Sequence, residues 1–255
     1  MRVCYGTWLT WALTLLAVLV GTVAPYRTTG APADDTSTDV QRLFETRYRA
    51  WRHWVEDQDH GGLESSSGSR DWIYDNEPYR QLVALGPRSL PCMMARLRDE
   101  NALSAALHDV TKVKFHFHNQ SLASGKEHWS IDELPGVQWS RNPNVTELWL
   151  RWWNDERFHT PERFAKFYAE RQALLQQGDA KGAQEKCERI QNLGIPVLPC
   201  LLDRIGQGAT DLVPILSALT SGAVKPDASP ADCAKWWNAH KQEWTLPPAT
   251  TDKAK

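Results

Sequence analysis

The chain contains an internal repeat, because residues 85–111 return in related form and order at residues 193–220. The first copy begins LGPRSLPCMMARL and the second LGIPVLPCLLDRI, so Gly86 and Cys92 match Gly194 and Cys200. A Trp-Trp-Asn motif follows each copy. Repetition on this scale is typical of supersecondary units that bury their apolar faces against one another. The repeat therefore predicts related, packed units, and it names neither a ligand nor a reaction.

Helix start and stop signals surround both copies. Asn76-Glu77-Pro78 predicts the start of a short helix, and Gly86-Pro87 predicts its end. Thr160-Pro161 and Ser229-Pro230 are similar start signals, and apolar residues follow them at steps of three and four. Further helices are expected near 39–59, 90–97, 100–111, 144–153, 179–193, 198–205 and 210–220. The chain is predicted to be all-α, apart from a short strand suggested by the alternation in residues 112–118.

Two Trp-Trp pairs are the main candidates for a binding surface. Adjacent residues on a helix point about 100° apart, so the two rings of a pair cannot share one face. One interpretation is an aromatic platform that stacks on a sugar or a peptide, with the following Asn supplying a hydrogen bond. The other is packing between units, which recurrence in both copies favours. The candidate residues are Trp149, Trp152, Trp153, Asn154, Trp236, Trp237 and Asn238.

His116 and His118 are weak candidates for a metal site. In an extended segment their imidazoles would face the same side and could chelate a metal together with His108 or His128. Their spacing matches no established zinc pattern and the second copy has no equivalent, so surface histidines on an insertion are the alternative. We therefore expect no metal and no other cofactor.

Asp155 and Glu156 beside His159 raise the question of an acid–base pair. Such chemistry needs two groups in different environments across a pocket, whereas neighbours at a helix end are typical of a solvated terminus. The sequence has no Gly-rich phosphate loop and no G-x-S-x-G, H-E-x-x-H or C-x-x-C motif. No catalytic residue is predicted, and a hydrolytic or metal-dependent enzyme with its site in residues 112–159 is the alternative to binding.

Four cysteines lie beyond the N-terminal segment, at Cys92, Cys187, Cys200 and Cys233. If Gly194 is the turn of a helical hairpin, Cys187 and Cys200 lie at the same height on facing helices and could form a disulfide in an oxidising compartment. Separate buried thiols are the other interpretation. Cys92 and Cys200 fall in the first turn of a helix, where the dipole lowers a thiol pKa, but their apolar neighbours favour inert thiols.

The N-terminal segment predicts export. Residues 3–26 carry no charge, and residues 8–24 are apolar enough for a secretory signal or a short membrane anchor, with a buried core helix as the alternative. We expect residues 1–33 to be that signal or anchor, which makes the remainder periplasmic, otherwise extracytoplasmic, or membrane-tethered. Without residues 1–33 the chain has 27 Lys and Arg against 31 Asp and Glu, which argues against nucleic acid as a partner.

A helix, a Leu-Gly-Pro-x-x-Leu-Pro segment and a second apolar helix ending in Arg-Leu or Arg-Ile form a pattern that resembles HEAT-like α-solenoid repeats. It is most similar to a divergent form in exported bacterial proteins with Trp-rich helices. The resemblance covers residues 76–111 and 186–220, and it implies a short HEAT-like solenoid of two related units with a loop-rich insertion. The expected boundaries are 34–73 for an N-terminal helix and linker, 74–158 for the first unit with its insertion at 112–143, 159–244 for the second unit, and 245–255 for a flexible tail.

The expected function is that of a non-catalytic protein-binding or scaffold module. HEAT-like families mostly bind partners through a concave face and share no catalytic residue, so the resemblance implies none here. That face would be lined by the Trp helices and the insertion, and its partner would be a protein or a cell-envelope component. Carbohydrate binding through exposed Trp and a purely structural spacer are the other hypotheses.

Overall fold

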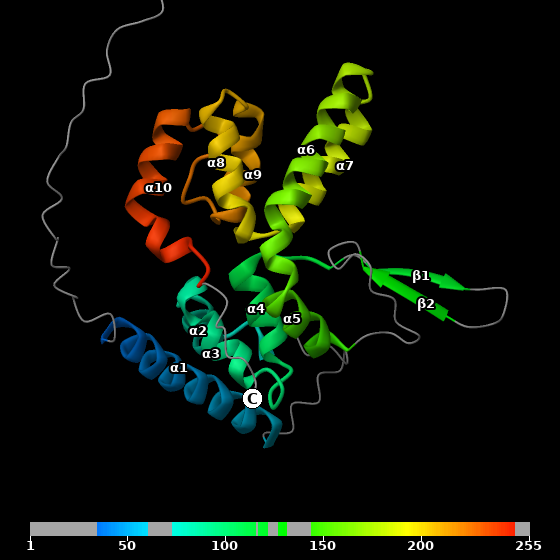
Figure 1. Cartoon of the computed structure of the whole chain (residues 1–255). Coiled ribbons are helices and arrows are strands. Elements are labelled where there is room, and N and C mark those ends of the chain that lie inside the picture. The colour runs from blue at the N-terminus through cyan, green and yellow to red at the C-terminus, as the bar shows by residue number, and fades with distance from the viewer. Residues whose placement is uncertain (1–34, 61–72, 116, 122–126, 132–143, 248–255) are drawn as a thin grey trace, which may run out of the picture.

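The protein is built almost entirely of α-helices, as the sequence predicted (Figure 1). The computed structural model describes residues 35–60, 73–115, 117–121, 127–131 and 144–247. Its helices are α1 (Asp35–His60), α2 (Glu77–Val83), α3 (Leu90–Arg96), α4 (Leu103–Thr111), α5 (Val145–Asn154), α6 (Thr160–Gln176), α7 (Ala180–Asn192), α8 (Leu198–Gly206), α9 (Val213–Leu219) and α10 (Pro230–Trp244). Short 3-10 helices join them: η2 (Gly86–Ser89), η3 (Glu156–His159), η4 (Ile195–Val197) and η5 (Thr210–Leu212). Two strands, β1 (Phe117–Ser121) and β2 (Glu127–Ile131), form an antiparallel hairpin.

Side-chain caps begin helices where the sequence predicted helix starts. The side-chain oxygen of Asn76 accepts a hydrogen bond from the backbone N–H of Tyr79 at 2.8 Å, at the start of α2. Asn144 and Ser229 accept equivalent bonds at the starts of α5 and α10. Each bond satisfies one of the N–H groups that a helix N-terminus leaves without an intrahelical partner. These predicted helix starts are confirmed.

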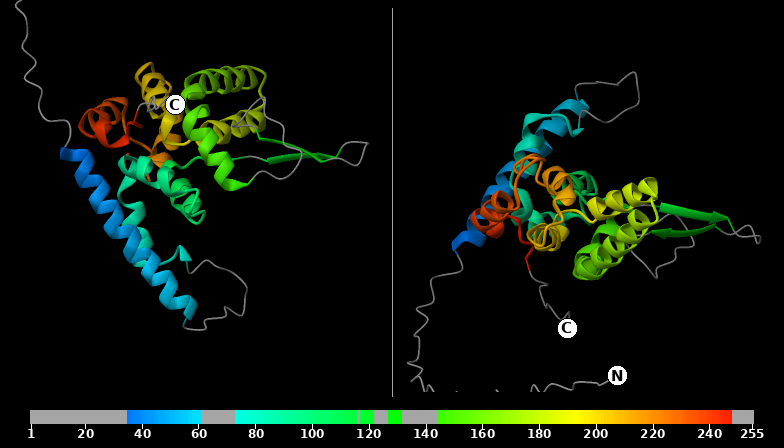
Figure 2. Two further views of the ribbon diagram at one scale, coloured as in Figure 1. Left: turned by 60° about the horizontal axis from the view of Figure 1, so that its bottom comes forward. Right: turned by 90° about the horizontal axis from the view of Figure 1, so that it is seen from above.

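The insertion after α4 contains the β-hairpin, which extends away from the helices (Figures 1 and 2). The expectation of a strand over residues 112–118 is corrected, because the strand begins later. Lys112 ends α4 in the left-handed conformation, with φ 59°. The backbone N–H of Lys114 then donates to the carbonyl oxygen of Asn192 at 3.1 Å. Those first residues of the insertion therefore join the two halves of the chain and do not pair in the hairpin.

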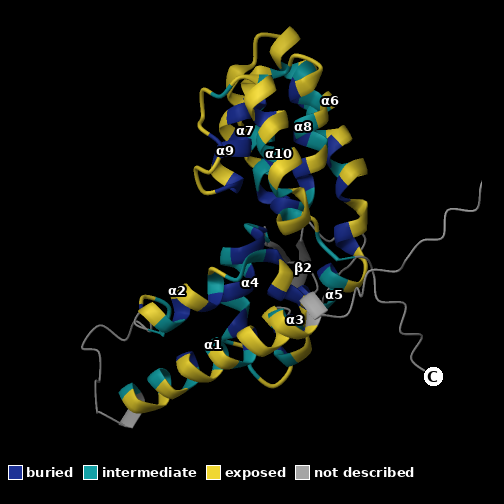
Figure 3. Ribbon diagram, turned by 90° about the vertical axis from the view of Figure 1, so that its left-hand side faces the viewer, coloured by how far each residue is buried: buried dark blue, intermediate teal, exposed yellow. Residues whose placement is uncertain are grey.

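Two apolar cores divide the described chain. Helices α1–α5 surround the first and helices α6–α10 surround the second, and Figure 3 shows the two groups one above the other. We call α1–α5 the first unit and α6–α10 the second unit. Trp51 and Phe44 are fully buried in the first core, and Ile190 is fully buried in the second. Leu246, just after α10, packs against both cores, so the end of the described chain ties the units together.

The duplication is larger than the repeat that the sequence shows. Helices α1 and α6 each begin a unit, and each carries a Phe and a Tyr four residues apart. The rings of Phe44 and Tyr48 are stacked with their centroids 5.8 Å apart, and those of Phe164 and Tyr168 are stacked at 5.7 Å. Each unit is therefore a set of five helices in the same order.

An arginine from the third helix of each unit completes the shared arrangement. The guanidinium carbon of Arg96 in α3 lies 4.9 Å from the ring centroid of Tyr48, and that of Arg204 in α8 lies 5.2 Å from the centroid of Tyr168. The two arginines are 108 positions apart, whereas the two tyrosines are 120 apart. The first unit has more residues between its tyrosine and its arginine than the second unit has. The first helices of the two units are therefore not related by the spacing that relates the later helices.

Gly194 lies at the junction between the units. Its φ of 71° and ψ of −161° belong to a region of backbone conformation that essentially only glycine adopts. A Cβ at this position would collide with the carbonyl oxygen of Thr111 and lie 2.6 Å from Cγ2 of Val113. The matching Gly86 also has a positive φ, of 65°, but a Cβ there would meet nothing within 4 Å. The backbone conformation therefore favours glycine in both copies, and close packing requires it only at the junction.

Hydrogen bonds to the Asp109 carboxyl make the stability of the first unit depend on pH. The bond from His108, and then that from the Tyr79 hydroxyl at 2.7 Å, hold the pKa of the Asp109 carboxyl below its ordinary value. A pKa lowered by folding stabilises the protein above the unfolded value of about 4, and this contribution is lost as pH falls through the folded value. We expect acid to lower the free energy of unfolding less steeply in Asp109→Asn than in the wild type, measured by urea unfolding between about pH 6 and pH 3. Equal slopes would contradict the assignment.

The predicted export segment, residues 1–33, lies outside the described residues, as do residues 248–255 of the predicted tail. Among the described helices, none is both long and apolar enough to cross a bilayer.

Candidate functional site

The first Trp pair lies mainly in the core of the first unit. Trp149 and Trp152 are 3% and 2% exposed, and their rings meet edge to face with centroids 5.4 Å apart. Neither buried ring presents a face on which a ligand could stack, so we assign both to the core. Trp153 is half-buried beneath Arg157, whose guanidinium carbon is 3.8 Å from the ring centroid, and Asn154 is exposed.

The second Trp pair is more accessible. Trp236 and Trp237 are half-buried against the second core, and Asn238 is exposed. The Trp236 ring stacks with His240 at a centroid distance of 5.4 Å. Trp236 also borders a hollow of about 420 Å³ together with Asp227, Asp232 and neighbouring loop residues. This ring therefore both supports α10 and reaches a concave surface.

The acidic pair near the end of α5 is split between interior and solvent. Glu156 is buried and accepts hydrogen bonds from Arg151, at 3.1 Å, and from Arg163. Asp155 is exposed, with a carboxylate oxygen 3.6 Å from the ring of His159. Both oxygens of the Glu156 carboxylate are engaged by guanidinium groups, and the exposed Asp155–His159 pair at a helix end lacks a pocket. The arrangement supports a structural role for these residues.

The candidate metal ligands are only partly within the described chain. His116 lies outside it, and His118 and His128 are described by their backbone alone, in β1 and β2. A ring nitrogen of His108 lies 3.3 Å from the carboxylate of Asp109. Among the residues that the structure describes, no group of three or more His, Cys, Asp or Glu is arranged to hold a metal ion.

The four cysteines in the described chain are free thiols, so the disulfide considered for Cys187 and Cys200 is not formed. The sulfur of Cys187 instead accepts a hydrogen bond from Nε of Arg171 at 2.9 Å. Burial raises the pKa of the Cys200 and Cys92 thiols. A raised pKa reduces the thiolate fraction, so neither thiol is an activated nucleophile.

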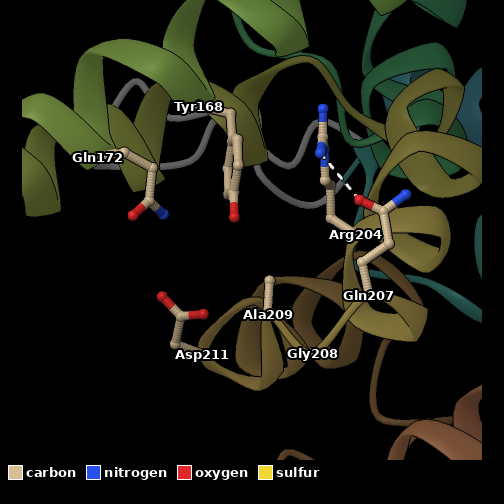
Figure 4. Close-up of a pocket in the computed structure, with 7 residues that line it drawn as sticks. All are labelled: Tyr168, Gln172, Arg204, Gln207, Gly208, Ala209 and Asp211. Carbon is tan, nitrogen blue, oxygen red and sulfur yellow. Dashed lines mark hydrogen bonds between the residues drawn. The ribbon is translucent and has the colours of Figure 1, made fainter. Parts of the chain in front are cut away.

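A polar hollow opens in the second unit, between α6 and the turn that follows α8 (Figure 4). We call it the second-unit hollow, and its volume is about 430 Å³. It is lined by Tyr168, Gln172, Arg204, Gln207, Gly208, Ala209 and Asp211. Sequence reasoning missed these residues, because they match no known site motif and belong to two separate segments of the chain, one in α6 and one running from α8 into η5.

Side chains with spare hydrogen-bonding capacity face this hollow. Tyr168 and Gln172 extend from α6 on one side, and Asp211 lies on the opposite side (Figure 4). Within the described chain, neither the Tyr168 hydroxyl nor the Gln172 amide has a hydrogen-bond partner. Arg204 donates one hydrogen bond, from Nη1 to the side-chain oxygen of Gln207 at 2.9 Å. The hollow is therefore lined by polar groups that a ligand could satisfy.

The turn after α8 shapes the hollow. Gly208 has a φ of 103°, and the backbone N–H of Ala209 reaches back to the carbonyl oxygen of Arg204 at 3.0 Å, which is the bonding pattern of a glycine-terminated helix. This turn leads into η5, whose Asp211 accepts a hydrogen bond from the buried Arg171. Nη1 of Arg171 has no hydrogen-bond partner among the described residues. Asp211 is thus held in place by a buried cation behind it.

The first unit fills the same position with its own side chains. Arg52 of α1 corresponds in register to Gln172 of α6, and its guanidinium lies 2.7 Å from the carboxylate of Glu100 in the turn after α3. The same carboxylate is 3.5 Å from the hydroxyl of Tyr48. In the second unit, the small residues Gly208 and Ala209 stand where the first unit has Glu100, so the space stays open.

A second concave surface lies between the units. It is a groove of about 640 Å³ bordered by α1, α3 and the C-terminal end of α10. Its lining residues are Val40, Gln41, Arg88, Pro91, Cys92, Ala95, Gln242, Thr245 and Pro247. The groove shows that α10 packs against the first unit without closing the space between them.

Comparison with protein-family models, with curated proteins and with solved structures identified no match for this chain. The site must therefore be interpreted from its own geometry.

Proposed function

We propose that the protein is a non-catalytic binding module whose ligand occupies the second-unit hollow. One observation carries the proposal: the first unit closes this position with the Arg52–Glu100 ion pair, and the second unit leaves it open. Unpaired polar groups at a partly buried surface are costly unless water or a ligand satisfies them. In this proposal the first unit has a structural role and the second unit binds the ligand.

The finer architecture and the setting belong to the same proposal. The two five-helix units, each with a positive-φ glycine before a Leu-Pro helix, are consistent with a short HEAT-like solenoid. Residues 1–33 would act as a signal peptide or membrane anchor that places the module outside the cytoplasm. Its partner there would be a protein or another cell-envelope component that presents a polar group to the hollow.

The proposal is tested by titrating small probes into the full chain and following backbone amide signals by NMR. The panel is sodium acetate, ethylammonium chloride, glucose and inorganic phosphate, each at about 10 mM, where a ligand with a Kd of about 1 mM occupies most sites. We expect at least one probe to shift the signals of Tyr168, Gln172 and Arg204. The corresponding first-unit signals of Tyr48 and Arg52 should stay in place, because that position is already filled.

A blocking variant and a matched control make the test specific. The Ala209 side chain points into the hollow (Figure 4), so Ala209→Phe should fill it and abolish the shifts. Ala234→Phe places the same ring on the exposed surface of α10 and should leave the shifts unchanged. If no probe moves the second-unit signals, or if Ala209→Phe binds as well as the control, the hollow is not a binding site.

Carbohydrate binding is the second candidate function. It is favoured by the hollow beside Trp236, where Asp227 and Asp232 offer carboxylates next to an aromatic ring. In the same titration, glucose would then shift signals around Trp236 and leave those of Tyr168 in place.

A further inference from the structure

The first unit contains two carboxylates that satisfy its shared tyrosine–arginine arrangement. Glu45 accepts hydrogen bonds from Arg96 at 3.0 and 2.6 Å. Glu100 lies 2.7 Å from Arg52 and 3.5 Å from the hydroxyl of Tyr48. Arg96, Arg52 and the Tyr48 hydroxyl therefore all have carboxylate partners within the first unit.

The second unit keeps the tyrosine and the stacked arginine but has lost both acids, and Gln172 replaces Arg52. Tyr168 and Arg204 repeat the stacked geometry of the first unit, with the guanidinium carbon 5.2 Å from the ring centroid. Ala165 stands in α6 at the position that Glu45 has in α1, and the small residues Gly208 and Ala209 stand where the first unit has Glu100. Within the described chain, no carboxylate lies within ion-pair distance of the Arg204 guanidinium.

The charge around the hollow limits what can replace the missing acids. Arg204 donates to Gln207, whose amide nitrogen donates in turn to Asp203 at 2.8 Å, so only part of the guanidinium is engaged. Asp211, on the opposite side, already accepts from Arg171 and adds a negative charge there. An anion would therefore be favoured beside Arg204 and Tyr168 and disfavoured beside Asp211. A small anionic group that bonds at one end of the hollow fits this distribution.

We infer that the second-unit hollow binds a carboxylate beside Tyr168 and Arg204, in the region where the first unit has its own carboxylates Glu45 and Glu100. Arg204 and Tyr168 donate to its oxygens, the Gln172 amide is a further donor, and Asp211 faces the remainder of the ligand. This inference rests on the proposed binding function and specifies its ligand. The carboxylate comes from an acidic side chain, from a chain terminus or from a free small acid, and the three share this chemistry.

Acetate is the direct probe, with sodium chloride at the same ionic strength as its control. In the titration of the full chain, acetate should shift the signals of Tyr168, Gln172 and Arg204, and ethylammonium should not. Because hydrogen bonds to charged groups contribute strongly, we expect Arg204→Gln to weaken acetate binding by about tenfold or more. Tyr168→Phe, which keeps the ring, should weaken it by a smaller factor. Acetate shifts that survive Arg204→Gln unchanged would overturn the inference.

The first unit supplies an internal test that does not depend on the second. Glu100→Ala should open the matching position beside Tyr48 and Arg52, and acetate should then raise the Tm of this variant more than chloride does. The wild type should show no acetate-specific signal at Tyr48, because Glu100 occupies the place. If acetate neither stabilises Glu100→Ala nor shifts its first-unit signals, the inference that this position binds a carboxylate is wrong for both units.

Model compounds then separate the sources. N-acetylglutamate α-amide represents an acidic side chain, N-acetylalanine represents a chain terminus, and free glutamate represents a small zwitterion. The compound that binds most tightly identifies the source, and all should lose binding in Arg204→Gln. If phosphate or glucose binds the hollow and these carboxylates do not, the proposed binding function is supported and the carboxylate inference is wrong. If none of these probes binds the hollow, both the proposed binding function and the carboxylate inference are wrong.

Discussion

Alanine in place of Gly194 is expected to lower the free energy of unfolding by about 3 to 5 kcal/mol, which is a large fraction of the stability of an ordinary domain. Two effects add together. The backbone conformation at Gly194 is one that residues with a Cβ rarely adopt, and the new methyl group would collide with Thr111 and Val113. Either the clash displaces the segment after α4, or the two units separate at their junction. Urea unfolding followed by circular dichroism measures the loss.

Gly86→Ala is the matched control because it changes the same position of the repeat in the other copy. Gly86 has a similar positive φ, but its surroundings are open. We expect a loss of about 1 to 2 kcal/mol from the conformational cost alone. The difference between the two variants therefore reports the packing of the units against each other. Equal losses would show that the contact of Gly194 with the first unit adds nothing to stability.

Removing the charge of Glu156 is the second large effect that we expect. Glu156 is 4% exposed and is shared by Arg151, at the end of α5, and Arg163, in the first turns of α6. Glu156→Gln would leave the two guanidinium groups without their common carboxylate in a partly buried place. Breaking a buried ion pair in this way costs about 3 to 5 kcal/mol, and the exposure of Arg151 places the expected loss near the lower value.

Glu77→Gln is the control for this prediction. Glu77 also accepts hydrogen bonds from two neighbours, Arg80 and Gln81, but it does so at the surface of α2. Exposed ion pairs contribute little, so the change in unfolding free energy should be much smaller than for Glu156→Gln. Urea unfolding in low and high salt would measure both variants. A loss at Glu156 no larger than the loss at Glu77 would rule out a structural role for the buried carboxylate.

The helices could be predicted because their signals are local. Asn76, Asn144 and Ser229 satisfy N–H groups three residues ahead of them, so the cap and its helix are within a few residues of each other. The repeat also predicted two related hairpins around Gly86 and Gly194. The strand was misplaced because Lys112 still belongs to the end of α4 and the backbone N–H of Lys114 bonds to the distant Asn192, and no local pattern reveals such a partner.

The candidate site was less accessible from the sequence. The Trp motifs attracted attention because they are conspicuous, yet Trp149 and Trp152 proved to be core residues. A usable signal did exist in the Phe-x-x-x-Tyr pattern of residues 44–48 and 164–168, which aligns α1 with α6. With that alignment, the replacement of Glu100 by the small residues Gly208 and Ala209 would have stood out as the loss of a carboxylate.

The order of the helices and the duplication follow from the amino-acid sequence, since helical periodicity, capping and repetition are all carried by neighbouring residues or matching strings. A sequence alignment of the two units shows which residues are exchanged, but whether the space between the first helix and this turn is filled or open was decided by the tertiary structure. The answer depends on how the turn at Gly208 folds back toward α6 and on whether a side chain from another helix reaches the space between them. Contacts between helices distant in sequence have no local signature, so the hollow became visible only once the helices were packed.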